Sequence, residues 1–245
     1  MRINAKGMHY KIINERIRSA IEKGEKKTIL DNINGQRYLG CGLKGNVNIT
    51  INGVPGNDLA AFMDGPLIIV NGNGQDAISN TMNAGKVKIF GNAGDVLGYS
   101  MRGGKLYIRG NVGYRVGIHM KSYKEQFPVM IIGGRAGDFF GEYMAGGILV
   151  LLGLYSEKSN SPIVGSYVGT GMHGGVIYLR GRINKYQLGK EVGVEEPNEE
   201  DLRKLEEYLA EFCSDFNLDL DEVLRQKFTK LVPHSHRPYG TIYAY

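Results

Sequence analysis

The sequence has few cysteines, no long hydrophobic run and no block of like charges. Only Cys41 and Cys213 occur among 245 residues, too far apart in sequence to indicate a disulfide framework or a zinc site. No stretch approaches the roughly 18 apolar residues of a membrane span, and residues 1–24 carry charges every few positions, unlike a signal peptide. We therefore expect a soluble, cytoplasmic protein with no membrane partner.

Charge does not indicate a nucleic-acid partner either. The net charge is +5, but 30 basic residues are interspersed with 25 acidic ones. Aromatic residues are not interleaved with a basic stripe, as a groove for single-stranded nucleic acid requires. We expect no nucleic-acid binding.

Glycine is the residue in excess, and an internal repeat explains it. Glycine makes up 36 of 245 residues, about twice the usual share, without the three-residue period of collagen. Six methionines follow one another at spacings of 19, 19, 19, 24 and 28 residues, and small residues recur three, seven and ten positions before them. These methionines are Met63, Met82, Met101, Met120, Met144 and Met172. A fixed period of this length is typical of a solenoid.

Each repeat also contains one short run of residues that favour β-strands. The runs are 47–51, 67–70, 87–90, 106–109, 129–132, 149–152 and 176–179. A 19-residue unit is long enough for one small coil, but too short for a strand, a crossover helix and a return. The expected fold is an all-β solenoid: a single-stranded right-handed parallel β-helix of about seven coils, with an N-terminal α/β cap and C-terminal helices. We expect the methionines to stack inside and the glycines to lie at corners, where a positive φ or a close approach between coils excludes a Cβ.

Three regions follow from this pattern: an N-terminal cap (1–44), the β-helix (45–182) and a C-terminal helical extension (183–245). The cap contains a helix followed by a strand and a turn; the apolar face of the helix comprises Ile13, Ile17, Ala20 and Ile21. In the extension, Pro197 and Asn198 introduce a helix with Leu202, Leu205, Leu209, Phe212 and Phe216 on one face. A second helix is expected to end before Pro233, with an apolar face formed by Leu220, Val223, Leu224, Phe228 and Leu231.

One segment imitates a nucleotide-binding motif. Residues 169–175, GTGMHGG, match the glycine fingerprint of dinucleotide-binding folds. That fingerprint needs a helix after the glycines, whereas 176–181 (VIYLRG) is a β-prone run. We interpret the segment as a corner of the repeat.

An interrupted acidic row is the first candidate for chemistry. Asp76, Asp95 and Asp138 each stand six residues before a repeat methionine, but the same position holds Asn57, Tyr114 and Ser166 in other repeats. Paired acids of this kind serve β-helices that cleave polysaccharides. Because the row is broken, we interpret these aspartates as turn caps that bond their own following backbone.

The histidines do not form a metal-binding pattern. His119 and His173 flank their methionines on opposite sides, and His234 and His236 have no further ligands nearby in sequence. The residues therefore predict no catalytic, cofactor-binding or metal-binding position on this chain.

Several ordered segments resemble a known family. They are 33–65, which begins INGQRYLG, then 92–121, 137–147 (GDFFGEYMAGG), 169–181 (GTGMHGGVIYLRG) and 227–240 (KFTKLVPHSHRPYG). Together they resemble the C-terminal GXGXG domain of the glutamate synthase large subunit, and the resemblance covers nearly the whole chain. Glutamate synthase converts glutamine and 2-oxoglutarate to two glutamates, using an N-terminal cysteine nucleophile, FMN and an iron-sulfur cluster.

The resemblance implies a part of that enzyme without its catalytic groups. Met1 is followed by Arg2 rather than a cysteine, and two cysteines cannot supply a three-cysteine cluster site. It implies a structural subunit for glutamate biosynthesis and ammonia assimilation, holding a glutamine amidotransferase and an FMN-binding synthase chain, with FMN and the iron-sulfur cluster on those partners.

Other functions remain open at this point. The β-helix subunit of formylmethanofuran dehydrogenase shares the repeat, although the flanking NGQRYLG and SHRPYG segments favour glutamate synthase. A carbohydrate-active β-helix enzyme would need an unbroken acidic groove. A self-assembling structural protein would associate through open solenoid ends, and homo-oligomers are compatible with every alternative.

Overall fold

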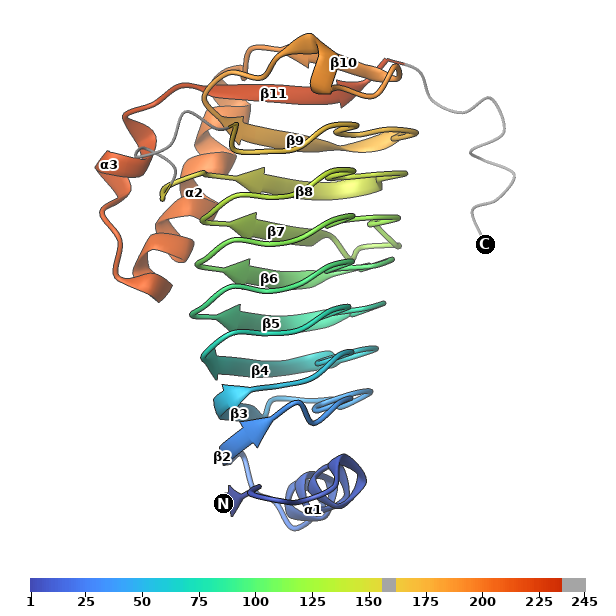
Figure 1. Cartoon of the computed structure of the whole chain (residues 1–245), viewed down its shortest axis with the longest axis vertical. Coiled ribbons are helices and arrows are strands. Elements are labelled where there is room, and N and C mark those ends of the chain that lie inside the picture. Colours follow the sequence, from blue (N-terminus) through green and yellow to red (C-terminus); the bar gives the residue numbers. More distant parts are fainter. Residues whose placement is uncertain (156–161, 235–245) are drawn as a thin grey trace.

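The protein is a column of stacked strands (Figure 1). The computed structural model describes residues 1–155 and 162–234. The strands form one 11-stranded sheet in the order β1-β2-β3-β4-β5-β6-β7-β8-β9-β11-β10. Their bounds are β1 Arg2–Asn4, β2 Lys27–Asn34, β3 Asn48–Val54, β4 Asp64–Asn71, β5 Ala84–Ile89, β6 Gly104–Ile108, β7 Pro128–Ile132, β8 Ala145–Leu151, β9 Gly174–Arg180, β10 Val192–Glu195 and β11 Phe228–Pro233. The helices are α1 Tyr10–Glu22, α2 Glu199–Phe216 and α3 Leu220–Leu224, with a 3-10 turn at Lys185–Gln187.

The parallel β-helix predicted from the repeat is confirmed. Each of the seven predicted runs forms a strand, β3 to β9, and each strand pairs in parallel with the next. Seven successive strands enclose six full coils, close to the expected seven. The parallel pairing continues below the predicted repeat, because β1 pairs with β2 and β2 with β3.

The interior of the column is a stack of equivalent apolar side chains. All six repeat methionines are at most 1% exposed and belong to one continuous core. Inward-facing strand residues such as Ile68, Val87 and Leu106 stack beside them at matched register. The predicted methionine ladder is therefore present, and its unbranched side chains fill the narrow interior.

The corner before each methionine has an unusual backbone. Residues five, three and one positions before the methionine all have positive φ, as at Val96 (58°), Gly98 (65°) and Ser100 (51°). The amide of Gly98 donates to Ile78 O in the previous coil (2.8 Å), whereas those of Val96 and Ser100 donate to the following coil. The middle left-handed residue thus donates to the coil below and the two outer ones donate to the coil above. Each corner is therefore hydrogen-bonded to the corners of both adjacent coils.

The two ends of the solenoid are covered by other elements of the chain. Helix α1 buries Ile13, Ile17 and Ala20, as predicted, and Ile13 and Ile17 join the core at its N-terminal end. At the other end β11 pairs antiparallel with β9 and β10 with β11, and Val192 and Leu231 close the core.

Helix α2 packs on the outer face of the sheet (Figure 1). Its buried residues Leu205, Leu209, Phe212 and Phe216 match the predicted apolar face, whereas Leu202 is 47% exposed. They form a second core with outward-facing residues of β6 to β9, which include Tyr107, Ile131, Val150 and Tyr178. Asn198 caps the helix by accepting from Asp201 N (2.9 Å), which defines its start beside Pro197.

The expected second C-terminal helix is only partly present. Helix α3 ends at Leu224, and Phe228–Pro233 forms strand β11 instead. Phe228 and Leu231 are three residues apart, so on a strand they point to opposite faces: Phe228 into the core under α2 and Leu231 into the solenoid. Because both faces of this strand are buried, its apolar residues have the spacing expected of a helix. The segment forms a strand because it hydrogen-bonds to the open edge of β9.

Charged side chains hold the C-terminal half of α2 to β5 and β6. Glu211 binds Lys86 (2.7 Å) and also pairs with Lys105, and Asp215 binds Lys88 (2.8 Å) and pairs with Lys86. Burial raises the pKa of Glu211, but hydrogen bonds from Lys105 and Lys86 outweigh it, so the pKa lies below its usual value. These ion pairs set the position of α2 along the column.

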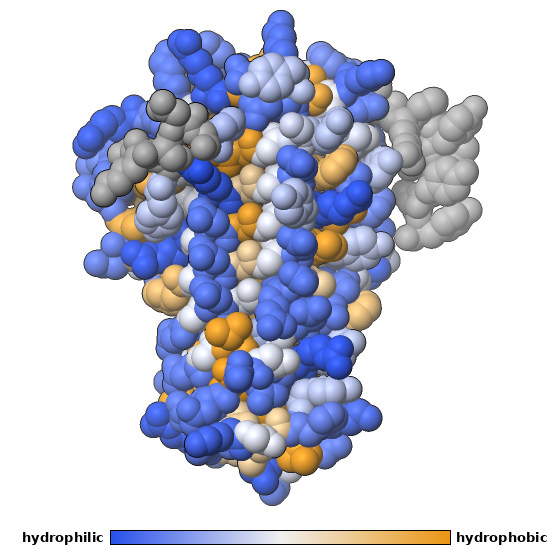
Figure 2. Space-filling model, viewed as in Figure 1, coloured by the Kyte–Doolittle hydropathy of each residue, from blue (hydrophilic) through white to orange (hydrophobic). Residues whose placement is uncertain are grey.

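Among the described residues, no helix has both the length and the apolar character to cross a bilayer. The face of the molecule seen in Figure 2 is mostly hydrophilic, with hydrophobic residues gathered in a narrow band along the column.

Candidate functional site

The predicted acidic row is an inter-coil ladder. Asp76 Oδ1 accepts a hydrogen bond from Asp95 N (2.9 Å), and Asp95 Oδ1 accepts one from Tyr114 N (2.8 Å). Asp138 Oδ1 accepts from Ser166 N in the same way (2.8 Å). The carboxylates therefore cap the next coil, and the prediction that they bond their own following backbone is wrong, because stacked coils bring an equivalent amide within reach.

This ladder also explains one register of glycines. A Cβ at Gly94 would overlap the carboxylate of Asp76, and one at Gly113 would overlap that of Asp95. Both predicted reasons for glycine at the corners are thus confirmed: a positive φ, as at Gly98, and a close approach between coils, as at Gly94 and Gly113. Each carboxylate has an oxygen committed to the backbone, which is a structural use of the acid.

The glycine segment that imitates a nucleotide motif lies at a corner of the solenoid. Gly169 and Gly171 have φ of 67° and 70°, three and one residues before Met172. Strand β9 begins at Gly174, where a nucleotide fold would begin a helix. The interpretation of GTGMHGG as a repeat corner is confirmed.

The histidines and cysteines lie in separate surroundings. The ring of His119 contacts two tyrosines, His173 Nδ1 lies 3.3 Å from Gly171 O, and the amide of His234 donates to Glu191 O (2.7 Å). His236 lies outside the described residues, among which no group of three His, Cys, Asp or Glu could hold a metal ion.

The two thiols are not activated. Burial raises the pKa of Cys213, under α2, to about 11. Burial also raises the pKa of Cys41, which is half-buried near α1. Neither environment favours the thiolate that a nucleophile needs.

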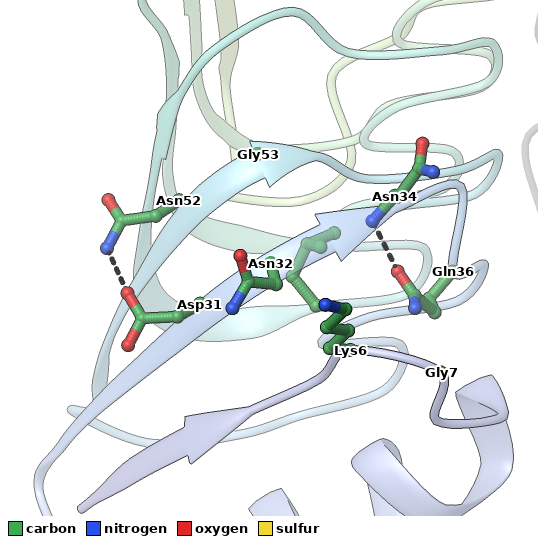
Figure 3. A pocket seen from close by; sticks show the side chains of 9 residues that line it. Lys6, Gly7, Asp31, Asn32, Asn34, Gln36, Asn52 and Gly53 are labelled. Atoms are coloured by element: carbon green, nitrogen blue, oxygen red, sulfur yellow. Dashed lines mark hydrogen bonds between the residues drawn. The ribbon is translucent and has the colours of Figure 1, made fainter.

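A polar hollow of about 690 Å³ lies at the N-terminal end of the column (Figure 3). Three segments line it, 6–7, 31–36 and 52–53. Its polar groups bond one another: Asn52 donates to Asp31 Oδ1 (2.7 Å) and Asn34 N donates to Gln36 Oε1 (2.6 Å). Nothing in the sequence pattern indicates this hollow, because the three segments meet only when the coils stack. Its side chains join β2, β3 and the loop before α1.

The surface of the left-handed corner gathers aromatic side chains over four coils. The rings of His119 and Tyr143 stack at 5.3 Å, and those of Phe139 and Tyr167 stack at 4.9 Å. The ring of Tyr99 meets that of His119 edge-on at 5.7 Å.

Arg115 connects the Phe139 ring to a buried acid. Arg115 lies over the Phe139 ring (4.8 Å) and binds the buried Glu142 (2.5 Å). We call this surface the aromatic corner; it consists of Tyr99, Arg115, His119, Phe139, Tyr143 and Tyr167. This corner lies where the strands begin, on the right-hand side of Figure 1, whereas α2 lies on the left-hand side.

Comparison with known proteins agrees with the repeat and the corner. Residues 11–236 match the family described by its GXGXG motif. The chain belongs to the GXGXG motif family. The structure accounts for the name, since corners such as 167–171 place three left-handed residues at alternate positions, two of them Gly169 and Gly171.

A relative from Methanocaldococcus jannaschii aligns with this chain over nearly its full length. It is an uncharacterized protein, 53% identical over 249 aligned positions that cover 98% of this chain and 95% of the relative. The GXGXG repeat and both capping regions therefore belong to one alignment.

Proposed function

We propose that this chain is a non-catalytic structural subunit of a multi-chain glutamate synthase of the cytoplasm, in which it holds a glutamine amidotransferase chain and an FMN-binding synthase chain. FMN and the iron-sulfur cluster belong to those partners in this proposal. Glutamate biosynthesis and ammonia assimilation would then be activities of the complex.

Membership of the GXGXG family over residues 11–236 carries the proposal. The segments that resemble glutamate synthase include corners, strands and the flanks of the solenoid, in the expected order. Two features of the structure support a holding role. Both ends of the solenoid are covered by α1 and by β10 and β11, which leaves the sides of the column for partners. The acidic row is engaged in structural bonds, which speaks against the carbohydrate-active alternative.

Reconstitution tests the proposal. The purified chain is mixed with the amidotransferase and synthase chains of the same organism, and glutamate formed from glutamine and 2-oxoglutarate is measured with a chemical electron donor. We expect a stable complex in which glutamine-dependent activity requires this chain, and a colourless chain in isolation.

Two results would contradict it. The first is that neither chain binds, and the second is that the isolated chain carries stoichiometric FMN. Co-purification with chains of a formylmethanofuran dehydrogenase would instead support that alternative.

A further inference from the structure

We propose that the aromatic corner is the docking surface for one partner chain, whose contacting face is apolar at its centre and acidic at its rim. The inference rests on the proposed function, because it assigns a surface to one of the chains named there. Three observations carry it: the composition of the corner, its fixed geometry and the charge beside it.

The composition is that of a protein-binding hot spot. Tyrosine and arginine dominate such sites, because they combine a large contact area with a polar tip. Tyr167 is 55% exposed and Tyr99 is 38% exposed although both are large apolar side chains. Exposed apolar residues that are contiguous over several coils mark an interaction surface more strongly than isolated ones.

The rings are held in place before any partner binds. His119 lies between Tyr99 and Tyr143, and the Tyr143 ring packs so close to Gly171 that a Cβ there would overlap it. The positive φ of His119, Tyr143 and Tyr167 is set by the corner backbone and its inter-coil hydrogen bonds. A surface already ordered in this way loses little conformational entropy on binding.

The side of the corner next to the strands is basic. Arg102 and Lys121 directly follow ladder methionines, and Lys124 lies in the adjoining loop 121–127 with Glu125 as its one acidic residue. Tyr123 brings that loop against the coil that contains Met101, because its ring lies 5.8 Å from the Arg102 guanidinium. The same ring lies 5.4 Å from Lys124 Nζ. Arg102 Nε is buried and has no hydrogen-bond acceptor among the described residues. An acidic rim on the partner would complement this flank.

The ring geometry favours a protein over a nucleic acid. Binding of single strands needs free ring faces on which bases stack. In the two parallel pairs the rings stack on each other, and the Phe139 face also meets Arg115. The ring edges and hydroxyl groups that remain suit a packed protein interface.

The decisive variant is the triple substitution His119→Asn, Tyr143→Asn and Tyr167→Asn. These three residues have φ of 54°, 50° and 61°, and asparagine tolerates this left-handed region better than other non-glycine residues, so the corner should keep its backbone. Tyr38→Asn is the matched control, because Tyr38 is an exposed aromatic residue with φ of 60° at the equivalent corner three coils below Tyr99. Circular dichroism and thermal unfolding check that both variants fold.

Binding of the purified amidotransferase and synthase chains is then measured by biolayer interferometry. We expect the triple variant to bind one of the two chains at least about 100-fold more weakly, and the control to match the wild type. Lys121→Glu, an exchange at the basic flank, should slow association with that same chain and flatten its salt dependence.

The outcomes separate the two proposals. Unchanged affinity of the triple variant for both chains, with the complex intact, overturns the docking surface and leaves the proposed function standing. Failure of both chains to bind the wild type overturns both proposals. Binding of a single-stranded oligouridylate by the wild type and its loss in the triple variant, without binding of either chain, would assign the corner to nucleic acid instead.

Discussion

The repeat places individual residues in the left-handed backbone region at fixed positions. The position three before each ladder methionine has φ between 61° and 77° in every coil, yet it holds Ala60 and Ser79 in the first two and glycine in the later four. A Cβ in this region costs about 1–2 kcal/mol. Ser79 adds a buried hydroxyl without a hydrogen-bond partner in the described part of the chain.

We therefore predict that Ser79→Gly stabilises the protein. Relief of the left-handed strain and removal of the unpaired hydroxyl should together raise the free energy of unfolding by about 1 kcal/mol. Gly98→Ala, at the same position one coil later, should lower it by at least about 1 kcal/mol, since the added Cβ would overlap Met130. Urea unfolding measures both, and equal stability of the two variants would contradict the argument.

At the scale of elements, helix α2 depends on ion pairs as well as on its apolar face. Glu211 faces Lys86 and Lys105, and the Tyr107 hydroxyl donates to its carboxylate (3.2 Å). Burial, followed by the charge of Glu211 and this hydrogen bond, raises the pKa of Tyr107 far above its usual range. The carboxylate is about one third exposed, so solvent weakens its contribution.

Stability should accordingly fall with acid in a way that depends on Glu211. Its pKa is lower in the folded state than the ordinary 4.5, so its contribution is complete above that value and is lost as the pH falls through the lowered pKa. Glu211→Gln should be less stable than the wild type by up to about 1 kcal/mol near neutral pH. The difference should shrink as the pH falls into the acid range and vanish below the lowered pKa of Glu211. Chemical unfolding across this range tests it.

The exposed Glu206→Gln, on the same helix, is the control for that series. It forms none of the ion pairs described for Glu211, so the pH profile should match that of the wild type. A difference between Glu211→Gln and wild type that persists in acid would show that lost packing, rather than lost charge, is responsible.

The strands of the repeat could be predicted from the sequence, because each coil shows the same pattern again. Elements that occur only once were harder to predict. Strands β3 to β9 follow from the 19-residue period, and α1 and α2 follow from one-sided apolar faces. Strand β11 was mistaken for a helix, because Phe228 and Leu231 are buried on opposite faces and so lack the alternation of a half-exposed strand. The aromatic corner was missed since its rings come from different positions of four coils, and only stacking brings them together.

For the molecule as a whole, closed ends are what keep a solenoid from extending itself. The exposed edge of a parallel sheet and an open apolar interior both favour association with another copy. Here α1 covers one end with Ile13 and Ile17, which are at most 1% exposed, and β10 and β11 cover the other. This arrangement disfavours assembly through open ends.

Disruption of α1 should consequently cause self-association. The double variant Ile13→Glu and Ile17→Glu places charges where about 1.5–3 kcal/mol of burial per side chain is gained, so the helix should detach and expose the core. Light scattering after size exclusion should then show larger species than for the wild type. Ile12→Glu, at a 45% exposed position of the same helix, should not alter the size distribution, and an unchanged double variant would contradict this account.

The fixed advance of each coil also makes the column a ruler. Because consecutive coils present the same inward set, excision of one complete 19-residue unit would join equivalent positions and shorten the molecule by one strand spacing, about 4.8 Å. The inserted loop 121–127 shows that extra residues can be added between a methionine and its strand without altering the register of the strands above. The height of the column and the shape of its surface can therefore change independently. The number of whole repeats sets the distance between the two ends, whereas insertions change the surface and leave the spacing of the coils constant.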